Sequence, residues 1–191
     1  MTPTATTMTA VPSRSRHRVW TYADYCKIPA DGRRHEIIDG RHYVSPAPDE
    51  RHQAASLELS IAIGLKVKRA GLGRIYTAPF DVHLGRGTLV QPDLVVVHRR
   101  NLAVIGARKI TGVPDLVVEI LSPSTRGSDR REKKARYQRA GVREFWIVDT
   151  DEKTVEQFVL RNGRYGAAVV WRERVRLSIM RGITIDLTNV W

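Results

Sequence analysis

Apolar and polar positions along the chain predict a series of β-strands interrupted by two helices. In residues 35–44 the pair Asp39-Gly40 lies between two β-prone runs, which is the signal of a tight hairpin. Pro48-Asp49 is suited to cap a following helix that ends before Gly71. The apolar positions with helical spacing in this segment are Ala54, Leu57, Ile61 and Leu65. The helix is therefore expected to pack that stripe against a sheet.

The middle of the chain is rich in β-prone residues. Residues 74–83 and 88–97 flank Gly85-Arg86-Gly87 and predict a second hairpin, whose returning strand runs over residues 89–97. Residues 114–121 form a nearly continuous apolar run, as expected of a strand that is covered on both faces. These segments predict the centre of the sheet.

The last third of the chain adds one helix and further strands. A polar helix is predicted from Ser128 to Ala140, followed by a core strand over residues 144–149. The order strand, helix, strand indicates a crossover that joins parallel neighbours. Shorter strands that extend the sheet are predicted over residues 154–160, 164–171 and 182–188. The fold class is therefore α/β or α+β with a mixed β-sheet.

Nothing in the pattern divides the chain into several domains. There is no internal repeat and no inner linker, so residues 18–191 are interpreted as a single domain, and residues 1–17 as a disordered N-terminal tail. The tail lacks the apolar centre of a signal peptide, and no apolar run is long enough to cross a bilayer. Cys26 is the single cysteine, which excludes an internal disulfide and fits the reducing cytoplasm. No partner that would make it a nucleophile lies near it in the sequence.

Charge changes the picture toward an anionic partner. The 191 residues include 32 Lys and Arg against 20 Asp and Glu, a formal charge of +12. Basic side chains displace the counterions condensed on phosphate, so this balance favours nucleic acid as a partner. The excess is mostly arginine and spread along the chain, which a coding bias toward arginine would also produce.

Three carboxylates lie within apolar strands, where a charge is costly unless it is paired or holds a metal. They are Asp93, Asp115 and Glu119. Asp115 and Glu119 share a strand face but lie roughly 13 Å apart, too far to bind one cation. Asp93 on a neighbouring strand, ~4.8 Å away, is a better partner for Glu119 around Mg²⁺. Alternatively, Asp93 and Asp115 begin strands after proline, and Glu119 pairs with an arginine; the pattern favours this structural role for Asp115 and the metal site for Asp93 with Glu119.

Other residues are candidates of lower specificity. On the second helix Asp129, Lys133 and Tyr137 share one face, so Lys133 can either neutralise charge that develops on a phosphate or belong to a solvated surface. Glu36 can line the same cleft or face solvent at a hairpin edge. His52 can be a base, a phosphate contact or an ordinary histidine of a helix N-terminus. For Glu36 and His52 the structural interpretation is the simpler one.

Several of these motifs occur together in an order that resembles the Uma-two family, a group of restriction-type endonucleases in the PD-(D/E)XK nuclease superfamily. The resemblance covers roughly residues 20 to 188. The motifs that carry it are Pro92-Asp93, residues 114–125, Asp129 with Lys133 and Tyr137, residues 141–149, Glu36 with Asp39-Gly40, and His52-Gln53. Their number and order make the resemblance specific, whereas a single Pro-Asp pair would carry no information.

The resemblance implies a restriction-endonuclease-like core, a mixed sheet flanked by helices, that hydrolyses phosphodiester bonds with Mg²⁺ or Mn²⁺. Asp93 corresponds to the aspartate of the superfamily motif and Glu119 to its acidic residue, and both would bind the metal. The motif lysine would stand two residues after the acid, where this chain has Leu121. Lys133 matches a recurrent lysine of the family and is expected to take over the charge.

The remaining expectations concern the rest of the site and its partners. Glu36, His52, Asp115 and Tyr137 are expected to support the catalytic residues. The side chains expected to hold the backbone of nucleic acid, with DNA as the first candidate, are Arg126, Arg130 and Arg131. A homodimer would suit the cutting of both strands of a duplex.

Two other functions fit the same residues. A nuclease-like module that binds DNA or a protein without cutting is favoured by Leu121, whereas Asp93 and Glu119 argue against it. A metal-dependent hydrolase of a smaller phosphorylated substrate is the third possibility, and a strong salt dependence of DNA binding would weigh against it.

Overall fold

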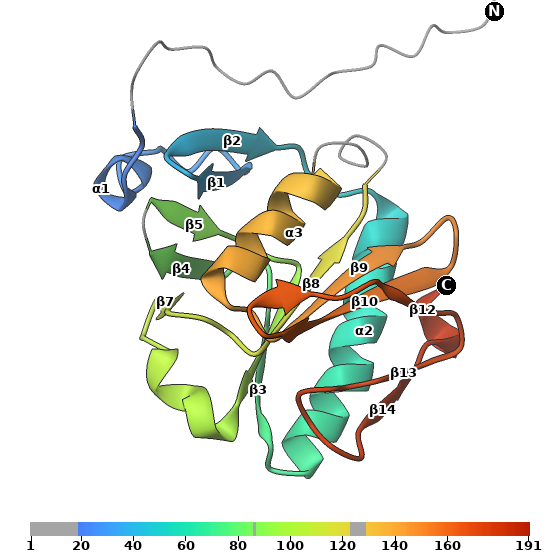
Figure 1. Ribbon diagram of the computed structural model, residues 1–191. Coiled ribbons are helices and arrows are strands. Elements are labelled where there is room, and N and C mark those ends of the chain that lie inside the picture. The colour runs from blue at the N-terminus through green and yellow to red at the C-terminus, as the bar shows by residue number, and fades with distance from the viewer. Residues whose placement is uncertain (1–18, 86, 123–128) are drawn as a thin grey trace, which may run out of the picture.

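The larger of two main β-sheets forms the centre of the molecule in the computed structural model (Figure 1). The structure describes residues 19–85, 87–122 and 129–191; for residues 129–131 it describes the backbone alone. The tail predicted over residues 1–17 lies outside the described residues. The order of strands in the larger sheet is β11 (Arg164–Tyr165), β10 (Thr154–Arg161), β9 (Glu144–Asp149), β8 (Leu116–Ile120), β6 (Leu94–His98) and β3 (Gly73–Thr77), with β12 (Val169–Trp171) also paired to β10.

A smaller sheet packs against part of one face of the larger sheet, and helices cover the rest of its two faces. Its order is β2 (Arg41–Ser45), β1 (Arg34–Ile38), β5 (Thr88–Val90), β4 (Asp81–Gly85) and β7 (Lys109–Thr111). A separate pair consists of β13 (Arg174–Arg176) and β14 (Thr184–Asp186). The helical elements are α1 (Tyr22–Tyr25), α2 (Glu50–Arg69), α3 (Asp129–Ala140) and the 3₁₀ turns η1 (Arg99–Val104) and η2 (Thr188–Val190).

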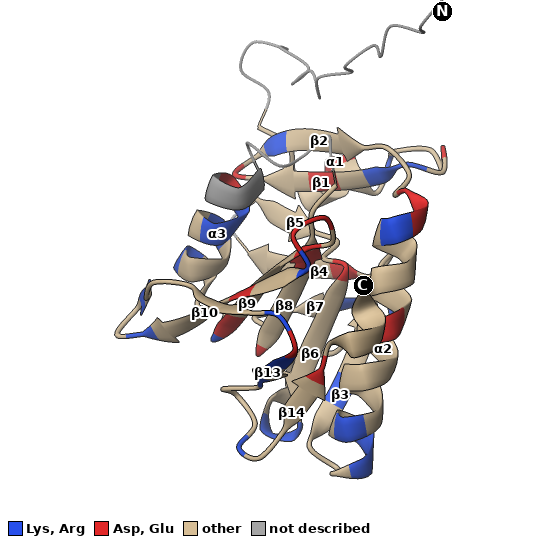
Figure 2. Cartoon of the chain, turned by 90° about the vertical axis from the view of Figure 1, so that its right-hand side faces the viewer, with Lys and Arg blue, Asp and Glu red and all other residues tan. Residues whose placement is uncertain are grey.

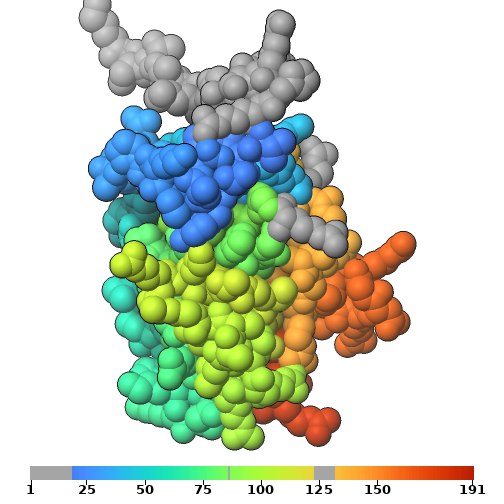
Figure 3. Space-filling view, turned by 90° about the vertical axis from the view of Figure 1, so that its left-hand side faces the viewer, coloured from blue at the N-terminus to red at the C-terminus, as the bar shows by residue number. Residues whose placement is uncertain are grey.

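The larger sheet is the middle of three layers. One of its faces packs on α2 and on the C-terminal segment, and the other packs on α3 and the smaller sheet (Figure 1). In Figure 3 the first described residues, in blue, lie next to residues from the middle of the chain, in green. Strands β8 and β9 are parallel neighbours joined through α3, and the other pairs of the larger sheet are antiparallel. The predicted mixed sheet and its crossover are confirmed.

The first hairpin has the predicted turn. Asp39 and Gly40 both have positive φ, 52° and 72°, as a two-residue turn that matches the strand twist requires. The hairpin joins β1 to β2, and β1 continues into the smaller sheet by pairing with β5. This placement brings the β1 side chains next to the residues that follow β5.

The two long strands predicted around Gly85-Arg86-Gly87 are each broken in the middle. The hairpin between β4 and β5 is confirmed, but β3 and β6 pair with each other in the other sheet. The breaks fall at Pro79 and Pro92, since proline cannot donate a hydrogen bond to a ladder. Residues 91–93 therefore cross from one sheet to the other, and Asp93 lies where the two sheets separate.

Two of the predicted C-terminal strands are also different. Residues 164–171 form two short strands, β11 and β12, both paired with β10. The strand predicted over residues 182–188 does not extend the large sheet; within the described part of the chain its central part, β14, pairs with β13 alone. The apolar side chains of β13 and β14 pack against α2, so they are buried although neither strand belongs to the larger sheet.

Helix α2 begins as predicted, with the Asp49 side chain accepting a hydrogen bond from the backbone N–H of His52 at 2.9 Å. Its predicted buried face is wrong. The residues that face the sheet are Ala55, Leu59, Ile63 and Val67, together with His52. The predicted stripe points outward, with Leu57, Ile61 and Leu65 exposed at 59%, 44% and 47%. Two apolar stripes with four-residue spacing run along this helix, and only one can face the sheet.

Among the helices described, none combines the length and the apolar composition that crossing a membrane requires.

Candidate functional site

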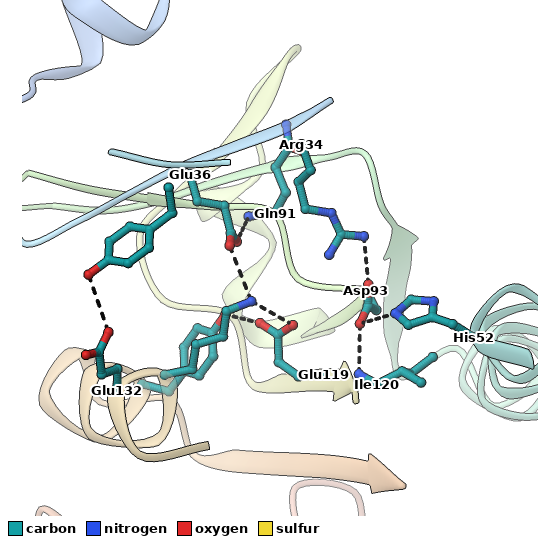
Figure 4. A network of polar contacts seen from close by, with 11 residues as sticks. Arg34, Glu36, His52, Gln91, Asp93, Glu119, Ile120 and Glu132 are labelled. Atoms are coloured by element: carbon teal, nitrogen blue, oxygen red, sulfur yellow. Dashed lines mark hydrogen bonds and ion pairs between the residues drawn. The ribbon is translucent and has the colours of Figure 1, made fainter. Parts of the chain in front are cut away.

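Asp93 is buried at the entry to β6, where it contacts side chains from two other elements (Figure 4). Because β6 pairs with β8 through Leu94 and Val118, one more step of this antiparallel register brings Asp93 opposite Glu119. Oδ2 of Asp93 accepts a hydrogen bond from the backbone N–H of Ile120 at 2.8 Å. The predicted side-by-side arrangement of the two carboxylates follows from this pairing.

Two basic side chains, one from β1 and one from α2, contact the Asp93 carboxylate. Arg34 of β1 donates from Nη2 to Oδ1 at 2.7 Å, and Nε2 of His52 lies 3.2 Å from Oδ2. Burial by itself raises the pKa of Asp93, but the hydrogen bond with His52 and the charge of Arg34 outweigh this effect and lower the pKa to about 2. Asp93 is therefore an anion at neutral pH despite its burial.

Glu119 lies at the centre of a second set of contacts, formed with helix α3. Its Oε1 accepts a hydrogen bond from the Tyr137 hydroxyl at 2.6 Å, and its Oε2 lies 3.2 Å from Nζ of Lys133. Burial raises the pKa of Glu119 to about 7, with the neighbouring Asp93 and Glu36 adding to the rise and Lys133 opposing it. Glu119 can therefore exchange a proton near neutral pH.

Glu36 completes the site from the smaller sheet. Its Oε1 accepts a hydrogen bond from the backbone N–H of Gln91 at 2.8 Å, and its Oε2 lies 3.3 Å from Nζ of Lys133. The ammonium of Lys133 thus bridges Glu36 and Glu119, which come from different sheets. Glu36 is buried, so of the two alternatives for this residue the one at a hairpin edge in solvent is wrong, and Glu36 lines the site.

The structure brings together most of the residues that the sequence singled out. Glu36, His52, Asp93, Glu119, Lys133 and Tyr137 form one network. Asp115 is not part of it, because its carboxylate accepts from the backbone N–H of His98 and from the side chains of Asn101 and Arg143. These contacts tie the start of β8 to η1, which is the structural role that the pattern favours for Asp115.

Sequence reasoning missed Arg34. It lies two residues before Glu36 on the same strand and so on the same face, which is a signal that the alternation of β1 contains. The expected nucleic-acid contacts are a different case: Arg126 lies outside the described residues, as do the side chains of Arg130 and Arg131. Elsewhere, Lys and Arg are spread over both long helices and several strands (Figure 2).

The donor set of the site is one of oxygen atoms, which suits a hard cation such as Mg²⁺. In the described part of the chain no three Asp, Glu, His or Cys side chains are grouped so that they would hold a metal ion together. Mg²⁺ commonly takes only one or two carboxylates and completes its shell with water and substrate phosphate. Asp93 and Glu119, opposite each other on neighbouring strands, fit that requirement.

Comparisons with known proteins found one matching family model and a matching solved structure. The family model described as "Uma2: Putative restriction endonuclease" matches residues 22–188. A crystal structure from Anabaena variabilis, described as "a putative nuclease belonging to DUF820", has a TM-score of 0.72 and 23% sequence identity, covering 89% of this chain and 96% of that chain. No curated protein matches the chain. The structural likeness shows that the two chains share a fold.

Proposed function

Since this chain belongs to the Uma2 (Uma-two) family of restriction endonuclease-like proteins, as its motifs led us to expect, we propose that it is a metal-dependent endonuclease that hydrolyses phosphodiester bonds of DNA. The observation that carries the proposal is the convergence of Asp93, Glu119 and Lys133 where the two sheets separate. The family and the shared nuclease fold support a nuclease. The metal requirement and the DNA substrate are the steps that we add.

Asp93 and Glu119 are the residues that would hold the metal. When bound, Mg²⁺ or Mn²⁺ supplies polarisation of the phosphate and a lowered pKa of bound water. His52 orients the Asp93 carboxylate through its Nε2 contact, and Tyr137 orients Glu119 through its hydroxyl. We regard both as positioning residues.

Lys133 is proposed to supply the positive charge that the superfamily motif places on the strand. Its Nζ reaches Glu119 from α3, although Leu121 stands at the usual lysine position. A preorganised cation beside a reacting phosphate stabilises the negative charge that grows in the transition state. Arg34 is a second such cation, since its side chain is 20% exposed while it holds Asp93.

A nuclease-like module that binds DNA without cutting it is the second candidate. The observation in its favour is that Arg34 and Lys133 already pair with the carboxylates that would take the metal. A measurement of cleavage activity distinguishes this binding module from the proposed endonuclease.

The deciding experiment is cleavage of supercoiled plasmid and of labelled single strands with Mg²⁺, Mn²⁺ or EDTA. We expect nicking that requires the metal and falls at least 100-fold in Asp93→Ala and Glu119→Ala, consistent with the loss of metal ligands. Glu58→Ala, which removes a half-buried carboxylate of α2 outside the network, is the matched control and should cut normally. A folded protein that binds DNA in a salt-dependent manner and never cuts would replace this proposal with the binding module.

A further inference from the structure

A cavity of about 590 Å³ adjoins the site on the side of Asp93. Arg34, His52 and Asp93 line it, whereas Glu36, Glu119 and Lys133 do not. In Figure 4 the Arg34–Asp93–His52 group lies to one side of the network and Glu119 with its partners to the other. The cavity is therefore an approach to the carboxylates that begins at Asp93.

Three loops frame this cavity. They are the segment between α1 and β1, the segment between β2 and α2, and the residues between β3 and β4. Their contribution to its wall is largely apolar and includes Ile28, Pro29, Pro46, Pro48 and Pro79. Arg34, His52 and Asp93 line the part of the cavity next to the site, and the charged residues Asp31 and Arg33 also contribute to the lining. An apolar wall with a few convergent polar groups is the usual composition of a small-molecule site.

The charged end of the cavity has capacity for a further polar partner. Arg34 uses Nη2 for Asp93, and its planar fork carries other donors that can bind phosphate. The His52 side chain is 8% exposed, and its buried Nδ1 has no hydrogen-bond partner among the residues that the structure describes. Buried polar atoms are normally satisfied, so an unpaired one in the lining of a cavity indicates a ligand that has polar groups of its own.

We propose that this cavity receives one unpaired nucleotide next to the scissile phosphate. The apolar wall would hold the base and sugar, and Arg34 would hold the phosphate. A volume of about 590 Å³ lies in the range for a single drug-sized ligand. Extruding a nucleotide from a duplex breaks its base pair and its stacking contacts, so the preferred substrate is single-stranded DNA. The inference rests on the proposed function of the same site and names its substrate class.

Cys26 provides a direct probe, because it is the single cysteine of the chain, is exposed and lines this cavity. The wild-type protein is treated with a chromogenic disulfide reagent in EDTA, without or with a 12-nucleotide single strand or the same sequence as a blunt hairpin. We expect the single strand at saturation to slow the modification of Cys26 at least fivefold, and the hairpin to slow it far less. Equal protection by the two, or none by the single strand, would overturn the inference.

Filling the cavity is the second test. Ala47 lines the cavity at its exposed rim, whereas Ala54 is exposed on α2 and does not line it. Ala47→Trp should weaken the binding of a fluorescent single strand at least tenfold in EDTA, and Ala54→Trp should leave it within twofold. Equal affinity of both variants and the wild type would contradict the inference. Neither test requires cleavage. A protein that never cuts but shows both effects would therefore contradict the proposed endonuclease function and support the nucleotide site.

Discussion

Replacing Lys133 by methionine removes the ammonium that lies between Glu119 and Glu36 while keeping an unbranched side chain in the same place. Nζ of Lys133 is 3.2 Å from Glu119 and 3.3 Å from Glu36, and the three side chains are 10%, 9% and 3% exposed. Removing one partner of a buried ion pair costs about 3–5 kcal/mol, because the other charge stays buried without compensation. We therefore expect Lys133→Met to lower the free energy of unfolding by about that amount at pH 8.

The neighbouring lysine of the same helix is the matched control. Nζ of Lys134 lies 3.9 Å from the centroid of the Phe158 ring, a cation–π contact worth about 1 kcal/mol. Lys134→Met makes the same chemical change without exposing a carboxylate to an uncompensated environment. It should therefore cost about 1 kcal/mol or less.

Urea denaturation followed by tryptophan fluorescence, in EDTA, measures these differences. The cost of Lys133→Met should be smaller at pH 5.5 than at pH 8, since Glu119, with its pKa raised to about 7, then holds a proton. It should also be smaller, by about 1–3 kcal/mol, when Glu119→Gln is already present, as expected of residues in direct contact. If the cost were the same in both backgrounds and at both pH values, the charge bridge would not contribute to stability as reasoned.

Two further predictions concern packing and pH. Leu59→Ala should lower the free energy of unfolding by about 2–5 kcal/mol, whereas Leu57→Ala should change it by less than about 0.5 kcal/mol, because only Leu59 is buried; equal urea midpoints would contradict the observed orientation of α2. In EDTA the wild-type free energy of unfolding should fall as the pH rises from 4.5 toward about 7, since over this window the folded state keeps the Glu119 proton that the unfolded chain has released. Glu119 contributes at most about 3 kcal/mol to this fall, and Glu119→Gln should remove that contribution, while an identical pH profile of the two proteins would argue against a raised pKa.

The local signals in the sequence were sufficient for most of the elements. The Asp39-Gly40 turn, the Asp49 cap of α2 and the buried strand β8 depend on interactions among residues close in the chain, and all three occur as predicted. The position of Asp93 opposite Glu119 could also be predicted from the sequence, because a carboxylate in an apolar strand requires a partner and only a neighbouring strand is close enough.

The long-range choices were not accessible in the same way. Helix α2 carries two apolar stripes, and the side that faces the sheet depends on how the helix packs against β3 and the C-terminal segment. Similarly, the prolines that interrupt the long strands predict a break, but not that the two halves enter different sheets. Burial of one stripe rather than the other is decided by the sum of many contacts between distant segments.

The sequence by itself determined most of the secondary structure, the mixed sheet, the family resemblance and the two carboxylates around which the site is built. Only the tertiary structure identified Arg34 of β1 as the cation that holds Asp93, and only it showed that Lys133, a candidate from the sequence, contacts Glu119 from α3. It also placed His52, whose helix position alone indicates nothing about Asp93, beside that carboxylate at the edge of a cavity. Sequence periodicity reports the face of an element, whereas the distance between charges on different elements depends on how the layers dock, and the electrostatics of the site follow from those distances.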